Sequence, residues 1–393
     1  MQTLSQSPTD PAFVQNPYPF YARCRDAGDV IWWKDYGMAC ATSYAAVNAL
    51  LRDRRFGREI PANKRSPIPD HLAPFYAVEA HSMLELETPR HPRLRGLVMR
   101  AFTSRRIAGL GPEIETLCHE LIDAFPAGDV DLLPAFAQKL PVIVICRLLG
   151  VPEDMADTLL RWSNAMVTMY QARRTRADED AAAAASAAFA DFMRSYVDER
   201  RARPADDLIT SLIAAEEDGE KLSTDELIST CILLLNAGHE ATVHTLGNGV
   251  KALLERDLID AVQSADTIEQ ITEEVLRYDP PLHMFTRWAY EDAEVAGHTF
   301  RKGDEVGLLL GSANRDAAIW PDADRFDITR PIRPNTAFGA GVHFCVGAPL
   351  ARLELNIALP ILFQRCPGMR LVEPPTYANL YHFHGLEGLR VTY

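Results

Sequence analysis

The spacing of hydrophobic residues along most of this chain is that of amphipathic helices. Apolar residues recur every three or four positions over long stretches, which is the period of an α-helix with one buried face. Ser223-Thr224-Asp225-Glu226 has the pattern of a capping box and predicts a helix that continues past Leu246. The other predicted helices cover residues 17–27, 42–51, 93–149 (with breaks near 111, 128 and 134), 153–203 as a pair, 206–215, 268–277 and 348–364.

A smaller part of the chain has the short apolar or alternating runs of β-strands. Residues 31–33 and 38–42 predict a strand pair around a turn at Gly37, and further short strands are predicted at 285–289, 293–296, 305–310 and within 381–393. Residues 53–87 contain several prolines and no clear period, and a long irregular segment of this kind is usually functional. The pattern therefore predicts a mainly α protein with a small β portion.

Composition and charge narrow the class of protein. The 393 residues are 47% hydrophobic and 24% charged, and no Pro/Gly/Ser-rich linker interrupts them, so we predict a single domain over residues 1–393. The net charge of −14 argues against nucleic acid as a partner. The polar N-terminus and the short apolar runs predict a cytoplasmic protein with no membrane partner. Seven scattered cysteines without a Cys-x-x-Cys pair argue against a disulfide framework and a structural cysteine–zinc site.

One cysteine stands where a metal ligand would be expected. Residues 338–347 read Phe-Gly-Ala-Gly-Val-His-Phe-Cys-Val-Gly, so Cys345 ends a glycine-rich loop directly before the helix predicted at 348–364. Backbone N–H groups at a helix N-terminus stabilise a thiolate, and glycines let the backbone approach the sulfur closely. Pro349 fits the first helical turn. We therefore predict that Cys345 is a thiolate metal ligand.

This segment resembles the haem-binding signature of the cytochrome P-450 family, Phe-Gly-x-Gly-x-His-x-Cys-x-Gly, and every fixed position is matched. The resemblance implies the cytochrome P-450 fold, a triangular prism with a long central helix over the haem, and haem b as the cofactor. It implies that Cys345 is the proximal ligand of the haem iron and that His343 hydrogen-bonds a haem propionate. The signature residues expected at the haem are Phe338, Gly339, Gly341, His343, Cys345 and Gly347.

Three further parts of the chain resemble family motifs near the haem. His91 and Arg95 lie four residues apart, hence on one helix face, in a segment that is similar to the family's propionate-binding helix. Arg287 matches a further propionate-binding arginine on a strand. Glu274 and Arg277 resemble the family's Glu-x-x-Arg pair, and Arg325 matches the third member of the same structural triad.

The predicted central helix carries a departure from the family pattern. Residues 237–242, Ala-Gly-His-Glu-Ala-Thr, resemble the oxygen-binding motif, which implies haem contacts for Ala237 and Gly238 and catalytic positions at Glu240, Ala241 and Thr242. Ala241 stands where the family usually has a proton-relaying threonine, and Thr242 is about 100° further around the helix. Three routes stay open: water or a substrate hydroxyl bridging from Glu240, Thr242 acting through a distorted helix, or peroxide replacing dioxygen and electrons.

The resemblance also implies a mainly apolar substrate pocket. Its predicted lining is Phe75, Met83, Met166, Leu234, Ala237, Met284, Phe285 and Phe383. Such a set favours a small, mainly apolar organic substrate. A polar anchor could come from His283 or Tyr170, or from Arg58 or Arg173 for a carboxylate.

The implied activity is that of a haem-thiolate monooxygenase, which inserts one oxygen atom of dioxygen by hydroxylation or O-dealkylation with electrons from a ferredoxin and its reductase. Arg100, Arg105 and Arg106 would then lie near the proximal face, where an acidic ferredoxin docks. Two alternatives stay open. Ala241 motivates a peroxygenase that uses hydrogen peroxide on the same fold, and the fold would also suit a non-catalytic haem-thiolate binding or sensing protein.

Overall fold

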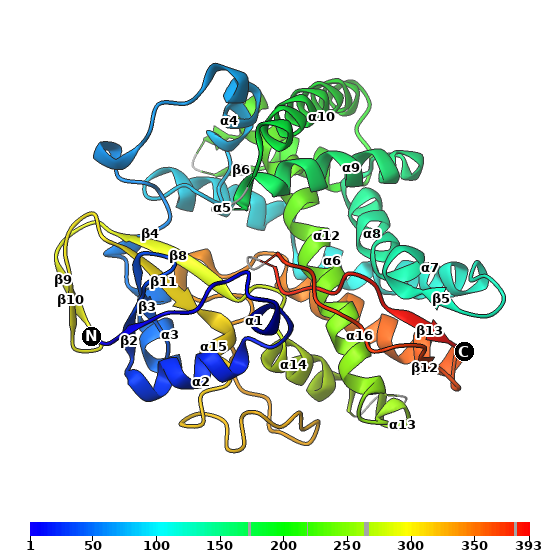
Figure 1. Cartoon of the computed structure of the whole chain (residues 1–393). Helices are drawn as coiled ribbons and strands as arrows, with labels where there is room; N and C mark the ends of the chain where they lie inside the picture. The colour runs from blue at the N-terminus through cyan, green and yellow to red at the C-terminus, as the bar shows by residue number, and fades with distance from the viewer. Residues whose placement is uncertain (172–173, 218, 263–266, 381–382) are drawn as a thin grey trace.

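Helices make up most of the computed structural model, which describes residues 1–171, 174–217, 219–262, 267–380 and 383–393. Figure 1 shows the helices gathered around one long helix, the larger sheet toward one side and a few short strands near the C-terminus on the other. The helices are α1 (Pro11–Gln15), α2 (Tyr18–Ala27), α3 (Tyr44–Arg52), α4 (Ala73–Glu79), α5 (Arg90–Ala101), α6 (Ser104–Gly109), α7 (Gly111–Asp123), α8 (Lys139–Leu149), α9 (Ala156–Val167), α10 (Arg176–Ala202), α11 (Leu208–Ala214), α12 (Thr224–Leu254), α13 (Ile259–Val262), α14 (Ile268–Tyr278), α15 (Leu310–Ala313) and α16 (Ala348–Arg365).

Helix α12 passes through the middle of the molecule and packs against α8, α9, α10, α14 and α16 (Figure 1). Its N-terminus is the predicted capping box: the Glu226 backbone N–H donates to Ser223 Oγ at 3.2 Å, and the Ser223 N–H donates to the Glu226 carboxylate at 2.9 Å. The residues from Leu227 to Leu235 are nearly all buried, because other helices surround this part of α12. A helix buried on most sides is apolar around its circumference, so its few polar residues stand out.

The larger sheet has six strands in the order β1-β2-β3-β11-β8-β4. The predicted hairpin is confirmed: β2 (Val30–Trp33) and β3 (Met38–Ala41) pair antiparallel around Gly37, whose φ is +64°. Strand β11 (Glu305–Leu309) runs parallel to β3 and antiparallel to β8 (Met284–Ala289). The two ends are β1 (Thr3–Leu4), parallel to β2, and β4 (Phe56–Gly57), antiparallel to β8.

Three smaller sheets complete the strands of the described residues. Strands β9 (Ala293–Val295) and β10 (His298–Phe300) form a hairpin, and β12 (Arg370–Leu371), β13 (Arg390–Thr392) and β5 (Val130–Asp131) form the second sheet. Strands β6 (Glu216–Glu217) and β7 (Glu220–Lys221) form the third. The predicted C-terminal strand thus exists at 390–392, and residues 381–382 lie outside the described residues.

One local expectation was wrong, and one strand was not predicted. The segment 53–87, predicted to be irregular, contains β4 and α4. Helix α4 is only seven residues long and includes Pro74, so its period is too short to read, and it is held by packing of Phe75 and Val78 in the main core. Strand β1 lies in the polar N-terminus and is defined only by its parallel pairing with β2.

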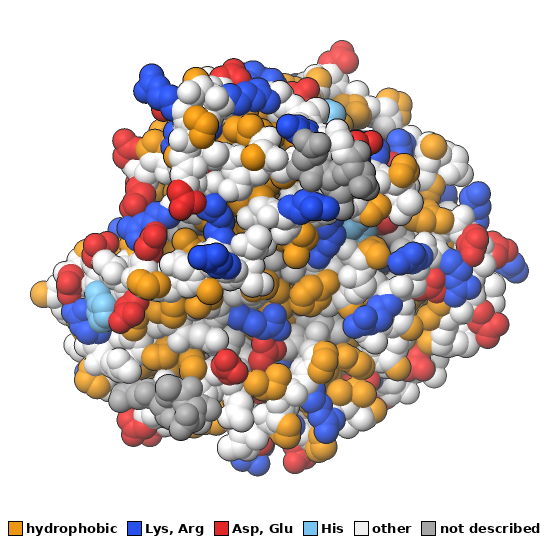
Figure 2. All heavy atoms as spheres, turned by 180° about the vertical axis from the view of Figure 1, so that it is seen from behind, with side chains coloured by type: hydrophobic (Ala, Val, Ile, Leu, Met, Phe, Trp, Pro, Cys, Tyr) orange, Lys and Arg blue, Asp and Glu red, His pale blue; other side chains and the backbone are white. Residues whose placement is uncertain are grey.

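The surface shown in Figure 2 carries basic side chains across the middle of the rear face, among hydrophobic ones. The net charge of −14 is therefore not spread evenly over this face. In the part of the chain that the structure describes, no helix has both the length and the apolar character needed to cross a bilayer.

Candidate active site

The cysteine loop is a tight structure whose glycines are required by their neighbours. Gly339 and Gly341 have φ values of +66° and +71°. A Cβ on Gly341 would lie 2.4 Å from the carbonyl oxygen of Leu51 on α3, and one on Gly339 would lie 3.3 Å from the Phe285 ring on β8. The loop closes with a hydrogen bond from the Cys345 N–H to the Phe338 carbonyl at 3.1 Å. Packing against α3 and β8 therefore fixes the cysteine at the start of α16.

The sulfur of Cys345 differs from the other six, which are all buried. The Cys345 side chain is exposed, yet desolvation by surrounding protein raises its thiol pKa, as for a group that faces an interior cavity. N–H groups of Gly347 and Ala348 and the charges of Arg95 and Arg352 act in the opposite direction. A bound metal ion removes the proton of such a thiol, so the loop fits a thiolate-ligated metal.

Two arginines, Arg287 and Arg58, lie close to the loop and to each other, one buried and the other partly buried. Arg287 on β8 is 2% exposed, and its guanidinium donates to the Thr286 carbonyl at 2.8 Å. Burial and the neighbouring charge of Arg58 lower the pKa of Arg287 to about 9. Arg58 pairs with Glu85 at 2.5 Å, while its buried Nε has no hydrogen-bond partner. A buried cation next to another cation is costly, so this region fits an anionic ligand such as a propionate.

The histidines of the two motifs meet at one point. The His91 and His343 rings lie 4.2 Å apart, and His343 Nε2 is 2.8 Å from Oε1 of Glu87. Burial, helped by His343, lowers the pKa of His91 to about 4. Burial would raise the pKa of Glu87, but the hydrogen bonds from His343 and the Arg58 N–H hold it below its usual value. Glu87 is a site residue that the motif comparison missed, although it directly precedes Thr88-Pro89.

Arg95 joins this cluster to the cysteine loop. Its guanidinium donates to the Phe344 carbonyl at 2.7 Å, one residue before the cysteine. The predicted propionate residues therefore form one connected group. Arg95 contacts the cysteine loop, and the His91 ring lies beside the His343 ring. His343 contacts Glu87, which accepts a hydrogen bond from the N–H of Arg58, the neighbour of Arg287. This donor set fits a group with two carboxylates next to a metal at Cys345, which is the chemistry of haem.

Helix α12 is largely buried, but two alanines one turn apart on it remain accessible to solvent. Ala237 is exposed and Ala241 is partly exposed, so this stripe of the helix faces a cavity. Gly238 instead faces α8, since a Cβ there would lie 2.9 Å from Cδ1 of Ile145. The glycine therefore permits close packing of a side chain from α8, and its predicted haem contact stays a prediction.

Thr242 does not take the place of the missing threonine in this structure. Its hydroxyl is buried and donates to the Gly238 carbonyl at 3.3 Å, one turn earlier on the face toward α8. Helix α12 runs without interruption from Thr224 to Leu254. The route through a distorted helix therefore finds no support in the structure.

Glu240 is held between two histidines. Its Oε2 is 3.2 Å from Nε2 of His239, and its Oε1 is 3.2 Å from Nε2 of His244. Burial would raise the pKa of Glu240, but these two hydrogen bonds outweigh burial and hold the pKa far below its ordinary value. Glu240 is therefore a carboxylate. His244 was not singled out in the sequence, although its spacing of four from Glu240 places the two side chains together.

The predicted pocket residues fall into three groups. Ala237, Phe285 and Phe383 keep exposed surface and can line a cavity. Four others are buried in the main core: Phe75, Met83, Met166 and Leu234. Met284 lies elsewhere, in the cluster beneath β2 and β3, where its sulfur would be 3.3 Å from a Cβ on Gly307. Successive residues on a strand point to opposite faces, so Met284 and Phe285 cannot share the pocket, and the prediction for Met284 was wrong.

The proposed polar anchors are already engaged. His283 is fully buried and its Nδ1 lies 3.0 Å from the Tyr21 hydroxyl, and Tyr170 donates to Glu79 at 3.2 Å. Arg58 is paired with Glu85 beside Arg287, which places it in the propionate region. Burial and the nearby Glu85 raise the pKa of Glu79 to about 7. Arg173 lies outside the described residues.

The structural triad has a different third member from the one predicted. Glu274 and Arg277 are both buried and form two contacts of 2.7 Å. The second arginine on Glu274 is Arg330, at 3.3 Å, whereas Arg325 is exposed and offers Arg277 only its backbone carbonyl at 3.1 Å. Both arginines lie in the same loop, and only its path decides which one turns inward.

Comparisons with known proteins agree with this geometry. A family model described as "Cytochrome P450" matches residues 255–368. The chain is 35% identical over 395 residues to the cytochrome P450 monooxygenase PikC of Streptomyces venezuelae, covering 96% of this chain and 90% of that protein. It is 40% identical over 345 residues to the mycinamicin IV hydroxylase/epoxidase of Micromonospora griseorubida, covering 85% of this chain and 83% of that protein.

Solved structures show the same fold. P450BioI, in a complex with an acyl carrier protein ligated to hexadec-9Z-enoic acid, has a TM-score of 0.90 with 34% identity over 97% of this chain and 99% of that chain. The bacillaene polyketide synthase cytochrome P450 PksS of Bacillus subtilis has a TM-score of 0.88 with 34% identity, covering 98% of this chain and 99% of that chain.

Proposed function

The chain belongs to the cytochrome P450 family and is a haem-thiolate monooxygenase, and from this premise we propose that it oxidises a small, mainly apolar organic substrate with dioxygen and electrons from a ferredoxin. The proposed reaction is a hydroxylation or an O-dealkylation. The observation that carries the proposal is the exposed Cys345 just before α16, next to a cluster of arginine and histidine donors that includes the buried Arg287. When bound, haem supplies oxygen activation, and its thiolate ligand favours O–O cleavage.

We assign the chain's residues to binding roles at this site. Cys345 supplies the sulfur ligand, and the loop glycines 339, 341 and 347 with Phe338 shape the backbone around it. Arg95, Arg287, His91 and His343 hold the propionates. Glu87 contributes a negative charge among these basic side chains, because its carboxylate contacts His343. Ala237 and Ala241 form the wall of the oxygen-binding side.

Proton delivery is assigned to the Glu240 group. Because the pKa of Glu240 is held far below its ordinary value, the group stays ionised and acts as a hydrogen-bond acceptor. Nε2 of His239 and Nε2 of His244 face its two oxygens and fix the orientation of the carboxylate. Glu240 thereby orients water, or a substrate hydroxyl, that carries a proton from solvent to the cavity beside Ala241, while the carboxylate itself keeps its charge. This arrangement compensates for the absent threonine.

Replacing Glu240 by glutamine is expected to lower ferredoxin-supported turnover by about 100-fold, since a neutral amide does not hold proton-carrying water as the carboxylate does. His244→Phe keeps a ring near Phe383 and is expected to give a smaller loss in the same direction. The measurement is product formation per electron consumed, with hydrogen peroxide as a parallel oxidant that should be affected much less. Thr242→Val is the matched control, because its hydroxyl bonds within α12. Equal losses in Thr242→Val and Glu240→Gln would refute the assignment.

The substrate class rests on the residues that keep open surface near α12. Ala237, Phe285 and Phe383 are apolar. The anchors His283, Tyr170 and Arg58 each contact another side chain. A titration of the haem protein with small apolar and aromatic compounds should shift the haem spin state. If no compound did so and reduced protein bound oxygen without turnover, the binding or sensing alternative would gain support.

The proposed docking surface for ferredoxin combines positive charge with exposed apolar side chains. Arg100 and Arg105 are exposed, as are Met99 on α5 and Val342 and Phe344 in the cysteine loop. Arg106 is partly committed, because it pairs with Asp206 at 3.0 Å. Arg95 links α5 to Phe344, so these elements form one surface near Cys345. Complementary charge mainly accelerates the encounter with an acidic partner.

Turnover with ferredoxin, ferredoxin reductase and dioxygen is expected to exceed turnover with hydrogen peroxide. Arg105→Glu should slow reduction by ferredoxin, with the effect shrinking at high salt, and should leave peroxide-supported turnover unchanged. Stopped-flow spectroscopy measures the rate of reduction by ferredoxin, and product analysis measures peroxide-supported turnover. Arg65→Glu, an exposed arginine in the 53–87 segment, is the control. Turnover with hydrogen peroxide that exceeded turnover with ferredoxin and dioxygen would instead favour the peroxygenase that Ala241 motivates.

A further inference from the structure

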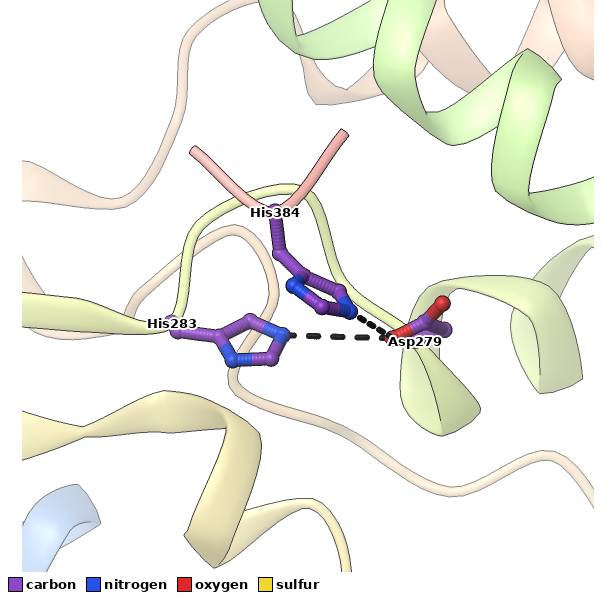
Figure 3. Close-up of side chains that lie close together, drawn as sticks. All are labelled: Asp279, His283 and His384. Carbon is purple, nitrogen blue, oxygen red and sulfur yellow. Dashed lines mark ion pairs between the residues drawn. The ribbon is translucent and has the colours of Figure 1, made fainter. Parts of the chain in front are cut away.

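A second group of metal-ligating side chains lies outside the haem site. Asp279 ends α14, His283 precedes β8, and His384 belongs to the C-terminal segment, and their ligand atoms all lie within 4.8 Å of one another. Figure 3 shows the three side chains pointing toward a common centre from these separate parts of the chain. Among the residues that the structure describes, this is the only such group.

The chain is folded so that the three side chains are brought together. The His384 N–H donates to the Pro281 carbonyl at 2.8 Å, and Phe383 forms an antiparallel bridge with Leu282. Asp279 is the residue that ends α14, because the two prolines after it cannot continue the helix. Backbone contacts therefore position all three residues. Because their side chains are short, little side-chain conformational entropy is lost when the group forms.

The distances are close to those of a tetrahedral metal site. Oδ1 of Asp279 is 3.4 Å from Nε2 of His384 and 3.9 Å from Nε2 of His283. Ligand atoms about 2.0–2.1 Å from a tetrahedral ion lie about 3.3–3.4 Å apart. One separation already has this value, and the other requires a shift of about 0.5 Å, which is within side-chain reach.

The His283 ring is held in a fixed orientation with one nitrogen available to a metal ion. His283 Nε2 is buried without a hydrogen-bond partner, and its other nitrogen lies 3.0 Å from the Tyr21 hydroxyl, an arrangement that orients the ring. An unpartnered buried nitrogen aimed at a carboxylate is costly unless an ion lies between them.

The surroundings supply orientation for the carboxylate and a path from solvent. Tyr18 and Tyr377 each donate to one oxygen of Asp279 at 2.5 Å, as partners of ligating carboxylates do. An open cavity of about 420 Å³ borders Tyr18, Asp279, Tyr377 and His384. Three cationic side chains also line the cavity: Arg315, Lys251 and Arg256. The Arg315 guanidinium is engaged by the Tyr278 carbonyl at 2.8 Å and stacks on the Tyr18 ring, and Lys251 lies over the Tyr377 ring.

We propose that Asp279, His283 and His384 form a binding site for a divalent transition-metal ion, with zinc as the favoured occupant, separate from the haem. Two imidazoles and one carboxylate suit Zn²⁺, and water completes its coordination. The ion joins the C-terminal segment to the turn between α14 and β8. That segment also carries Phe383, whose ring is 5.6 Å from the His244 ring. A bound ion would therefore hold Phe383 in place beside His244, the partner of Glu240.

The test is zinc binding to the haem-loaded protein after chelator treatment and desalting. Calorimetry should show one Zn²⁺ per chain, and zinc-edge X-ray absorption, which haem iron does not disturb, should show imidazole and oxygen ligands at about 2.0–2.1 Å. His384→Phe keeps the ring stacked on Tyr377, and Asp279→Asn keeps the shape of the carboxylate. Each should weaken zinc binding by at least ~100-fold, since each removes a ligand.

His298→Ala, on the β9–β10 hairpin, is the control and should bind zinc like the wild type. The carbon-monoxide spectrum of each variant reports whether the haem site has folded. The proposal is overturned if the wild type binds no zinc, or if binding persists unchanged in both His384→Phe and Asp279→Asn. A variant that loses zinc binding while keeping the haem spectrum supports the site, whatever the haem chemistry proves to be.

Discussion

Cys345→Ala is expected to abolish the strongly red-shifted Soret band that reduced protein shows with carbon monoxide when a thiolate ligates the iron. Monooxygenase turnover should fall by more than ~100-fold, because the substitution removes the only protein ligand assigned to the metal. Haem content should fall less than turnover, since the donors around Arg287 and Arg95 remain. Haem content, the carbon-monoxide difference spectrum and product formation are the three measurements.

The control for this substitution is Cys366→Ala. Cys366 is buried at the end of α16 and packs in the core, so its removal affects stability slightly and leaves the ligand in place. Retention of the red-shifted band in Cys345→Ala, or its loss in Cys366→Ala, would contradict the assignment of Cys345. We expect neither outcome, because Cys345 is exposed whereas the other six cysteines are buried.

Glu274→Ala is expected to lower the free energy of unfolding by about 3–5 kcal/mol, because it leaves the Arg277 guanidinium buried without its counter-charge. Arg277 keeps carbonyl acceptors at Asn314, Ala323 and Arg325, but carbonyls do not neutralise a charge. Denaturant unfolding of the haem-loaded protein measures the loss, and a much smaller one would show that the pair is solvated.

The identity of the third triad member is tested by a matched pair of arginines. Arg330→Ala should cost about 1–2 kcal/mol, since it removes an ion pair with Glu274 and bonds to the Pro321 and Asp322 carbonyls. Arg325→Ala should leave the unfolding midpoint unchanged, because only the Arg325 backbone takes part. The reverse order of effects would restore the assignment made from the sequence.

The sequence could predict those parts of the site that are local in the chain. The capping box of α12, the hairpin around Gly37 and the loop that leads into α16 each depend on a few adjacent residues, and all three exist. The position of Cys345 relative to its helix follows from the same local pattern. The arrangement of helix-forming residues was likewise readable, since period and caps are properties of short windows.

Other assignments depended on contacts between distant segments. Whether Met284 or Phe285 faces the cavity is decided by the pairing of β8 with β11, and a shift of one residue would exchange them. Arg325 and Arg330 are equivalent in the sequence, and only the fold of the loop turns Arg330 toward Glu274. The pairing of Glu240 with His239 and His244 is local in spacing, but its effect on the pKa depends on burial by other helices.

The sequence by itself determined the family, the haem thiolate and the helical frame, because these follow from motifs whose members lie close together in the chain. Tertiary structure alone decided which polar residues far apart in the chain became partners. Glu87 joined the propionate cluster through His343, and His384 came to lie beside Asp279 and His283, since residues roughly 100 positions or more apart meet only when the backbone is folded. A hydrogen bond or metal site between such segments has no pattern in the chain to reveal it.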